Sequence, residues 1–315
     1  MAIFLTEDDV QQLLPITDAI DAVEKGFKEQ GNGTAFNLHR SRVQAGEVGI
    51  TMMVAALGSR KVAGFKCMGI GGSMVLLYGG EKNQLLAVLE ARSLGQIRTG
   101  AASALASRYM APENASSIGV IGTGHQAETQ LEGTCAVRPI TRALAYSRTP
   151  EHLASFCTRM SRILDIEVSP ATSAQEAVQN SDIVIAITNV RTLDPVLLGK
   201  WVHPGQHLVA AGANTINRRE LDDEAVACCS LIVTDARDQA KLECADLAIP
   251  IEKGIWDWDN VWELGQIVTG QVEGRTSSDD ITLYESQGIA LEDVAVADFL
   301  FQKALIKGIG TELPF

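Results

Sequence analysis

The sequence predicts an α/β protein in which a doubly wound parallel sheet domain is inserted into an α+β domain made from both chain ends. From Ser116 onward, short apolar runs alternate with helical stretches, which is the pattern of a parallel sheet covered by helices. Before Pro112 the apolar runs are short, often alternating and separated by turn residues, as in antiparallel strands. We therefore expect one domain at 1–112 plus 288–315 and the inserted domain at 113–287.

The bulk composition limits the classes of function. The 315 residues are 46% hydrophobic, which is enough for about two domains with buried cores. A net charge of −13 repels phosphate backbones, so we expect no nucleic-acid partner. No run reaches the ~18 apolar residues of a membrane span, and no basic region precedes the apolar patch near the N-terminus, so we expect neither a membrane nor secretion. The cysteines form no C-x-x-C pair, which indicates a reducing cytoplasm.

The first 90 residues predict two helices and then strands. Thr6 before three acidic residues is a helix start, and Thr17 with Asp18 is a second, whose helix extends to Gly31. Apolar or alternating runs at 50–54, 62–67, 74–78 and 85–89 predict strands, and turn residues between the last two indicate a hairpin. The small, regularly spaced side chains of 93–110 predict a closely packed helix that carries Arg98 and Thr99 near its start and ends before Pro112.

In the inserted domain each expected strand is followed by a helix or a loop. The expected strands are 118–121, 142–146, 183–188, 208–211, 231–234 and 282–284. Helices are expected at 126–135, 151–164, 174–179 and 220–228, and a last helix at 291–307 returns to the first domain.

The stretch from Ser116 to Ala127 reads as a strand, a tight glycine turn and the start of a helix. Gly122 can adopt a φ that other residues avoid, Gly124 allows close approach of a ligand, and Ala127 lets the helix lie near the strand. The N–H groups of such a helix start bind an anion, most simply a dinucleotide pyrophosphate, which makes the domain Rossmann-type. A turn without any ligand is the alternative. The candidate cofactor-binding residues of this turn are Gly122, Thr123, Gly124, His125, Gln126 and Ala127.

The residues after the second strand bear on the choice of dinucleotide. NAD-specific sites have an acidic residue there, which binds the ribose 2′-hydroxyl. This chain instead has Ser147, Arg148 and Thr149, and a guanidinium beside hydroxyls suits a 2′-phosphate. NADP(H) is therefore favoured and NAD(H) remains possible, whereas a simple ion pair of Arg148 with Glu151 is the structural alternative. Thr188, at the end of a later strand, is a further cofactor-binding candidate.

The chain resembles the ornithine cyclodeaminase and mu-crystallin family over essentially its whole length. The matching segments are IRTGAASALASRYMAP, IGVIGTGHQAETQ, YSRT, WVHPGQHLVAAGANTINRREL and GIALEDVAVA. The resemblance implies a dimer-forming substrate domain, a central dinucleotide domain and chemistry on an α-amino or α-imino acid. Its members include ornithine cyclodeaminases, alanine dehydrogenases and reductases of ketimines or pyrroline-2-carboxylate.

The resemblance also implies site residues. Arg40 in NLHRSRV matches an arginine that meets the substrate carboxylate, with Arg42 as the alternative register. Lys66 in GFKCM matches the active-site lysine, Arg98 a second carboxylate-binding arginine, and Thr99 a cofactor contact. Such cations can clamp one carboxylate in a dry cleft. A charge such as Lys66 within an apolar strand pattern would be costly to bury without a partner.

Two departures from the family pattern bear on the reaction. Ornithine cyclodeaminases carry an acidic residue where this chain has Asn214, and an asparagine can orient a substrate or water but cannot act as a base. The stretch 66–73 is shorter than in most members and lacks the usual Gln and Thr. Asn214 therefore argues against cyclodeamination, and the short stretch places the substrate in question more than the cofactor.

These observations favour an NAD(P)H-dependent reductase of an α-imino acid, or an amino-acid dehydrogenase. Lys66 and Asn214 are its catalytic candidates, and Arg40, Lys66 and Arg98 bind the carboxylate. An ornithine cyclodeaminase is the first alternative, and an inert, crystallin-like NADPH-binding protein is the second. We expect a small-molecule amino or imino acid as the binding partner, a homodimer, and no metal, because the histidines do not cluster at ligand spacing.

Overall fold

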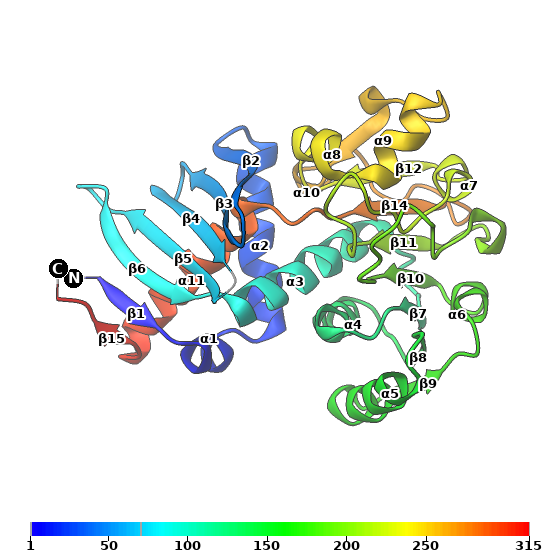
Figure 1. The fold of residues 1–315 in the computed structure, drawn as a ribbon, viewed down its shortest axis with the longest axis horizontal. Coiled ribbons are helices and arrows are strands. Elements are labelled where there is room, and N and C mark those ends of the chain that lie inside the picture. Colours follow the sequence, from blue (N-terminus) through cyan, green and yellow to red (C-terminus); the bar gives the residue numbers. More distant parts are fainter. Residues whose placement is uncertain (1, 70, 315) are drawn as a thin grey trace. The chain divides into compact units, whose positions relative to one another are not determined.

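The computed structural model describes residues 2–69 and 71–314, and the chain divides into two compact units (Figure 1). Unit 1 is Met1–Ala102 with Ile289–Phe315, and unit 2 is Ser103–Gly288. The first division falls inside helix α3 (Arg92–Met110), earlier than the position after residue 112 that the sequence suggests. The second falls between Gly288 and Ile289.

Unit 1 is organised around a sheet with the strand order β15-β1-β6-β5-β4-β3-β2. Its strands from β2 to β6 pair antiparallel with their chain neighbours, whereas β1 joins β6 in parallel. The strands are β1 (Ile3–Leu5), β2 (Ala35–Ala45), β3 (Val48–Leu57), β4 (Val62–Gly69), β5 (Gly72–Gly79), β6 (Gln84–Glu90) and β15 (Thr311–Glu312). Gly69 pairs with Gly72, so the short stretch after Lys66 is a tight hairpin, of which residue 70 lies outside the described residues.

The first two helices of unit 1 begin directly after residues that favour a helix N-terminus. Thr6 caps α1 (Glu7–Leu13) and forms a capping box with Asp9. Helix α2 (Ile16–Gly31) begins one residue before Thr17, because Pro15 fixes an extended backbone at its start. Helix α11 (Ala290–Lys307) packs against α2 and against β2 to β6. The close approach of α2 depends on Gly26, where a Cβ would lie 2.9 Å from Cδ2 of Leu291.

The two faces of this sheet differ in their cover. Alternate residues such as Met53, Ala55, Val75 and Leu77 are buried on the face that α11 covers. The residues between them form the outer face, which is apolar and exposed. Its large exposed members on β2, β3 and β5 are Phe36, Leu38, Val43, Val48, Ile50, Met52 and Met74.

Unit 2 contains a sheet with the order β13-β12-β14-β11-β10-β7-β8-β9, in which all pairings are parallel. Its strands are β7 (Ser117–Ile121), β8 (Arg142–Tyr146), β9 (Glu167–Pro170), β10 (Ile183–Ala186), β11 (His207–Ala210), β12 (Leu231–Thr234), β13 (Val261–Glu263) and β14 (Thr282–Glu285). Four of them, β7, β10, β11 and β14, are buried along their whole length. The predicted α/β architecture, a Rossmann-type sheet inserted into an antiparallel α+β domain, is confirmed.

The helices of unit 2 include four that match predicted helices. They are α4 (His125–Val137), α5 (Pro150–Leu164), α6 (Ala174–Gln179) and α7 (Asp223–Ala227). The prediction that α7 begins at Glu220 is wrong, because Asp222 accepts a hydrogen bond from the N–H of Ala225 and starts the helix there. Not predicted were α8 (Arg237–Glu243), α9 (Ala245–Glu252), α10 (Leu264–Val268) and the 3₁₀ turns Gly199–Trp201 and Trp258–Asn260. Within the described residues, every helix is too short or too polar to cross a membrane.

Candidate functional site

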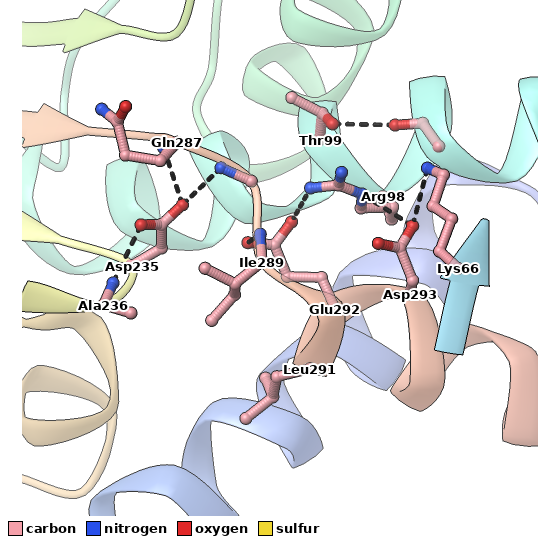
Figure 2. Close-up of polar contacts among 12 residues, drawn as sticks. Lys66, Arg98, Thr99, Asp235, Ala236, Gln287, Ile289, Leu291, Glu292 and Asp293 are labelled. Carbon is pink, nitrogen blue, oxygen red and sulfur yellow. Dashed lines mark hydrogen bonds and ion pairs between the residues drawn. The ribbon is translucent and has the colours of Figure 1, made fainter. Parts of the chain in front are cut away.

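Lys66 is a buried cation on the covered face of the unit 1 sheet. It lies in β4 between Met53 of β3 and Val75 of β5, and only 4% of its surface is exposed. Its Nζ donates to Oδ1 of Asp293, at 2.9 Å, on helix α11 (Figure 2). The partner that a buried lysine requires is therefore supplied by α11.

Arg98 reaches the same carboxylate from helix α3. Its Nε donates to Oδ1 of Asp293 at 3.1 Å, and its Nη1 donates to Oε2 of Glu292 at 2.5 Å (Figure 2). Both carboxylates are fully buried, and the Arg98 side chain is nearly so. Two consecutive acids in the first turn of α11 thus fix the guanidinium and the Lys66 ammonium next to each other.

Arg40 joins this group through an irregularity in β2. Leu38 pairs with Val54 and Ser41 with Met52, so residues 39 and 40 both lie opposite Met53, which in turn pairs with Lys66. The positive charge of Arg40 acts on Lys66, whereas the side chain of Arg42 is exposed. The structure therefore brings Arg40, Lys66 and Arg98 together, in an arrangement called here the cationic cluster.

The charges around Lys66 act on its pKa in opposite directions. Burial lowers the pKa of Lys66, Asp293 opposes this by favouring the ammonium, and the charges of Arg98 and Arg40 lower the pKa further. Arginine and lysine side chains gathered in this way suit a ligand that carries a carboxylate.

Thr99 lies beside Arg98 in the same helix, within unit 1. Its Oγ1 donates to the backbone oxygen of Gly95 at 2.7 Å, one turn earlier in α3. The side chain is buried. Its hydroxyl hydrogen is thus used inside the helix, and a cofactor contact of Thr99 stays a prediction.

The glycine turn of unit 2 adopts the strained geometry that its sequence suggests. Gly122 has φ +106°, its N–H donates to the oxygen of Tyr146 at 2.9 Å, and a Cβ would lie 2.4 Å from the oxygen of Ile187. Only glycine fits there. Since β8 and β10 lie on opposite sides of β7, the turn is at the point of the sheet edge where ligands of doubly wound folds bind.

The start of α4 can accept an anion. Gly124 is its N-cap and makes no side-chain capping bond, and, its chain neighbours aside, no atom of the described residues lies within 4 Å of where its Cβ would be. Gly124 and His125 are both exposed, so an anion can approach the N-terminus of this 13-residue helix. His125 is the exposed first residue of the helix rather than a part of the turn, and Ala127 is buried. These features fit a dinucleotide pyrophosphate.

The loop after β8 holds Ser147, Arg148 and Thr149. Ser147 is half-buried and its Oγ accepts from the N–H of Thr149 at 3.5 Å, while Arg148 is exposed. In the part of the chain that the structure describes, no ion pair joins Arg148 to Glu151. The guanidinium is therefore available to an external anion.

A buried acid that was not predicted organises the neighbouring loops. The predicted strand end at Thr188 is wrong, because β10 ends at Ala186 and Thr188 turns to Glu220. Oε1 of Glu220 accepts from the N–H and from Oγ1 of Thr188, each at 2.7 Å, and Oε2 accepts from the N–H of Gly212 at 2.6 Å. Asn214, which is half-buried, lies two residues after Gly212 in the same loop. The sequence predicts a helix that begins at Glu220, and the only signal of a different role is the place of Glu220 in RREL.

Asp235, after β12, is a second buried organiser of unit 2. Its Oδ2 accepts from the N–H groups of Gln287 at 2.8 Å and Gly288 at 2.6 Å, and its Oδ1 accepts from Ala236 at 2.8 Å (Figure 2). It thus shapes the end of unit 2, where the chain leaves for α11.

A third buried group comprises Cys244, Asp246 and Glu285, whose ligand-type atoms all lie within 4.8 Å of one another. Burial and the Glu220 charge raise the pKa of Asp246 to about 7, and burial with the Asp246 charge raises that of Glu285 well above its usual value. Protonation is how a dry interior tolerates such acids. Sequence reasoning missed the group because Glu285, on β14, is far in the sequence from Cys244 and Asp246 at the start of α9.

The two arrangements define the chain as a Rossmann-type α/β protein with a separate cluster of cationic side chains in unit 1. It belongs to the ornithine cyclodeaminase/mu-crystallin family, whose model matches residues 1–308. It is 34% identical to a Delta(1)-pyrroline-2-carboxylate reductase of Bacillus cereus over 243 residues, which is 77% of this chain and 74% of the relative.

Solved structures show the same relationship. The Delta(1)-pyrroline-2-carboxylate reductase of Thermococcus litoralis, in complex with NADH and L-proline, is 33% identical with a TM-score of 0.93 over 99% of this chain and 100% of that one. An archaeal alanine dehydrogenase dimer with bound NAD is 29% identical, with a TM-score of 0.91 over 100% and 99% of the two chains. The family predicted from the motifs is therefore confirmed.

Proposed function

We propose that this protein is an NAD(P)H-dependent reductase of a small α-imino acid, of the ketimine or pyrroline-2-carboxylate type. The observation that carries the proposal is the cationic cluster, in which Arg40, Lys66 and Arg98 come together in unit 1. The relationship to reductases of pyrroline-2-carboxylate supports it. The reverse reaction, oxidation of the amino acid, belongs to the same site.

The substrate carboxylate is bound by Arg40, Lys66 and Arg98 in this proposal. Arg98 is fixed through Nε and Nη1 by two carboxylates, so its guanidinium keeps one orientation. A preorganised donor loses little freedom when a ligand binds. The nearly complete burial of Lys66 and Arg98 also keeps water from competing with the ligand.

The dinucleotide is bound by unit 2 through residues of three loops at one sheet edge. The pyrophosphate lies at the start of α4, against Gly122, Thr123, Gly124, His125, Gln126 and Ala127. The adenosine ribose lies near Ser147, Arg148 and Thr149, and Thr188 contributes from the loop after β10. The exposed guanidinium of Arg148 favours a 2′-phosphate and hence NADP(H), with NAD(H) also accepted.

The reaction needs a hydride and a proton. The reduced nicotinamide supplies the hydride to the carbon of the C=N bond. Lys66 is the group of this chain that can give a proton to the imine nitrogen, because Asp293 stabilises its ammonium form. Asn214 orients the substrate or a water molecule.

Asn214 also separates this proposal from ornithine cyclodeamination. That reaction oxidises an amine, closes a ring and reduces the product, and it would require a base at this position. An amide cannot take up a proton at neutral pH. An inert, crystallin-like protein would bind NADPH but would have no use for a clamp of three buried or half-buried cations.

We also propose that two copies associate through the outer face of the unit 1 sheet, whose exposed side chains are apolar. The related alanine dehydrogenase is a dimer. The six cysteines are all free thiols, which supports a reducing, cytoplasmic location.

The proposed function is tested by the oxidation of NADPH and NADH in the presence of pyrroline-2-carboxylate, piperideine-2-carboxylate, or pyruvate with ammonium or methylamine. We expect oxidation with at least one imine and faster turnover with NADPH. NADPH binding without oxidation on the whole panel would support the inert protein. Release of ammonium and proline from ornithine with catalytic NAD would support the cyclodeaminase, and either result would overturn the proposal.

A further inference from the structure

We infer that Asp293 is the positioning residue of the reaction, which holds Lys66 as an ammonium aimed at the substrate and so provides the proton that the Asn214 amide cannot supply. This inference rests on the proposed reductase function. Asp293 lies in GIALEDVAVA at the start of α11, far from Lys66 in sequence, and it acts through Lys66.

The geometry gives Asp293 control over Lys66. One oxygen, Oδ1, accepts from Lys66 Nζ at 2.9 Å and from Arg98 Nε at 3.1 Å, as Figure 2 shows. The neighbours of Lys66 in the sheet, Met53 and Val75, are apolar. Asp293 is thus the carboxylate that directly contacts this ammonium.

Among the described residues, the second oxygen of Asp293 shares the carboxylate charge with no further donor. Oδ2 is buried and has no hydrogen-bond donor among the described residues. A buried carboxylate oxygen without a donor costs stability, which is consistent with a role for the charge of this carboxylate. Glu292, the adjacent acid, binds Arg98 instead and also caps its own helix.

The charged groups around Lys66 come from three elements. Asp293 of α11 favours the ammonium, and Arg98 of α3 and Arg40 of β2 oppose it, as does burial. Three influences therefore drive the proton off Lys66, and Asp293 is what retains it. Without the Asp293 charge, Lys66 would lose its proton at a lower pH.

Reduction of the imine adds one proton and one hydride to the C=N bond. Lys66 gives one proton to the nitrogen of the neutral C=N bond, and the hydride adds to the carbon, so that C–H and N–H bonds form as the π bond breaks. The reduced nicotinamide is oxidised by two electrons. Lys66 is left as a neutral amine that regains its proton from water, and Asp293 stays ionised throughout.

Because Asp293 raises the pKa of Lys66, it also determines the pH range in which kcat/KM is retained. Reduction requires the Lys66 ammonium, so kcat/KM is retained below the pKa of Lys66 and lost as the pH rises through it. Asp293→Asn keeps the shape but removes the charge, so we expect the alkaline limb of kcat/KM to move to lower pH by about one unit. Asp293→Glu restores the charge, and its limb is expected to return toward that of the wild type.

Asp298→Asn is the matched control. Asp298 is a buried aspartate of the same helix, and it binds Arg60 with an Nε–Oδ2 distance of 2.7 Å. Its loss removes a buried partner of a cation and destabilises α11, but it does not touch Lys66. We expect a lower Tm and an unshifted alkaline limb. If Asp293→Asn also left the limb unshifted, Asp293 would be only structural and the inference would be overturned.

A second measurement does not require turnover. In protein labelled with ¹³C at lysine Cε, the Lys66 resonance is assigned by its absence from Lys66→Arg and titrated in the wild type and in Asp293→Asn. We expect a lower midpoint in Asp293→Asn, and equal midpoints would overturn the inference. Wild-type protein inactive on the whole imine panel would instead overturn the proposed function, while this titration would still decide the role of Asp293.

Discussion

Glu220 holds Thr188 through a single oxygen, which accepts both the backbone N–H and the hydroxyl of that residue at 2.7 Å. Its other oxygen holds Gly212, in the loop after the adjacent strand. A fully buried carboxylate therefore fixes two loops at the sheet edge where the dinucleotide is proposed to bind. Burial raises the pKa of Glu220, and the hydrogen bonds from Thr188 and Gly212 oppose this.

Glu220→Gln is expected to weaken dinucleotide binding. The amide replaces one acceptor oxygen by a donor, so an N–H of Thr188 or Gly212 loses its partner, at a cost of about 1–3 kcal/mol. We expect the Kd for NADPH, measured by fluorescence titration, to rise about tenfold or more. Glu224→Gln, an exposed acid a few residues later, is the control and is expected to keep the wild-type Kd. Unchanged NADPH affinity in Glu220→Gln would show that these loops do not serve the cofactor.

Arg148→Asp is expected to shift cofactor preference from NADPH toward NADH. In the proposed function the exposed guanidinium attracts the 2′-phosphate, whereas an aspartate would repel it and accept from a 2′-hydroxyl instead. The ratio of kcat/KM for the two cofactors should change by about tenfold or more, since each 1.4 kcal/mol is tenfold. Arg162→Asp, an exposed change of equal charge on α5, tests for a general electrostatic effect. If Arg148→Asp and Arg162→Asp give the same ratio of kcat/KM for NADPH and NADH, Arg148 does not bind the 2′-phosphate.

Arg40→Ala and Arg42→Ala form a matched pair. Arg40 lies opposite Met53, in the row that contains Lys66, and its charge affects the pKa of Lys66, whereas Arg42 is exposed. A charged hydrogen bond contributes about 1.5–3 kcal/mol. We expect Arg40→Ala to raise KM for the imino acid about tenfold or more while KM for NADPH stays the same, and Arg42→Ala to change neither. The opposite outcome would assign the carboxylate contact to Arg42.

The sequence predicted much of this fold because its strands are apolar and its turns contain distinctive residues. The strand 142–146 and the helix 174–179 match β8 and α6 residue for residue. The strands β9 and β13 lie at the edges of the sheet, are short, and include Pro170 or polar residues, so they lack a buried strand's pattern. Helices α8 to α10 are short, which leaves few turns for helical periodicity to appear.

In the cationic cluster, only the cations could be predicted from the sequence. Lys66 was noticeable because a charge interrupts an apolar strand, but the partner of that charge, Asp293, is on a helix at the other end of the chain. Glu292 and Asp293 look in the sequence like ordinary acids of a first helical turn. Glu220 likewise pairs with backbone groups, which have no signature in a single sequence. Such roles depend on tertiary contacts and not on spacing.

The outer face of the unit 1 sheet provides the last prediction, which concerns assembly. Phe36 and Leu38 are 70% and 62% exposed on β2, beside further exposed apolar residues of β3 and β5. A second copy would cover this face, and charges placed on it would be buried without partners. We expect the double variant Phe36→Glu and Leu38→Glu to convert a dimer into a monomer in light scattering coupled to size-exclusion chromatography. Ile306→Glu, at a position that is 86% exposed on α11, should remain dimeric. A wild-type monomer, or a double variant that stays dimeric, would show that two copies do not associate through this face.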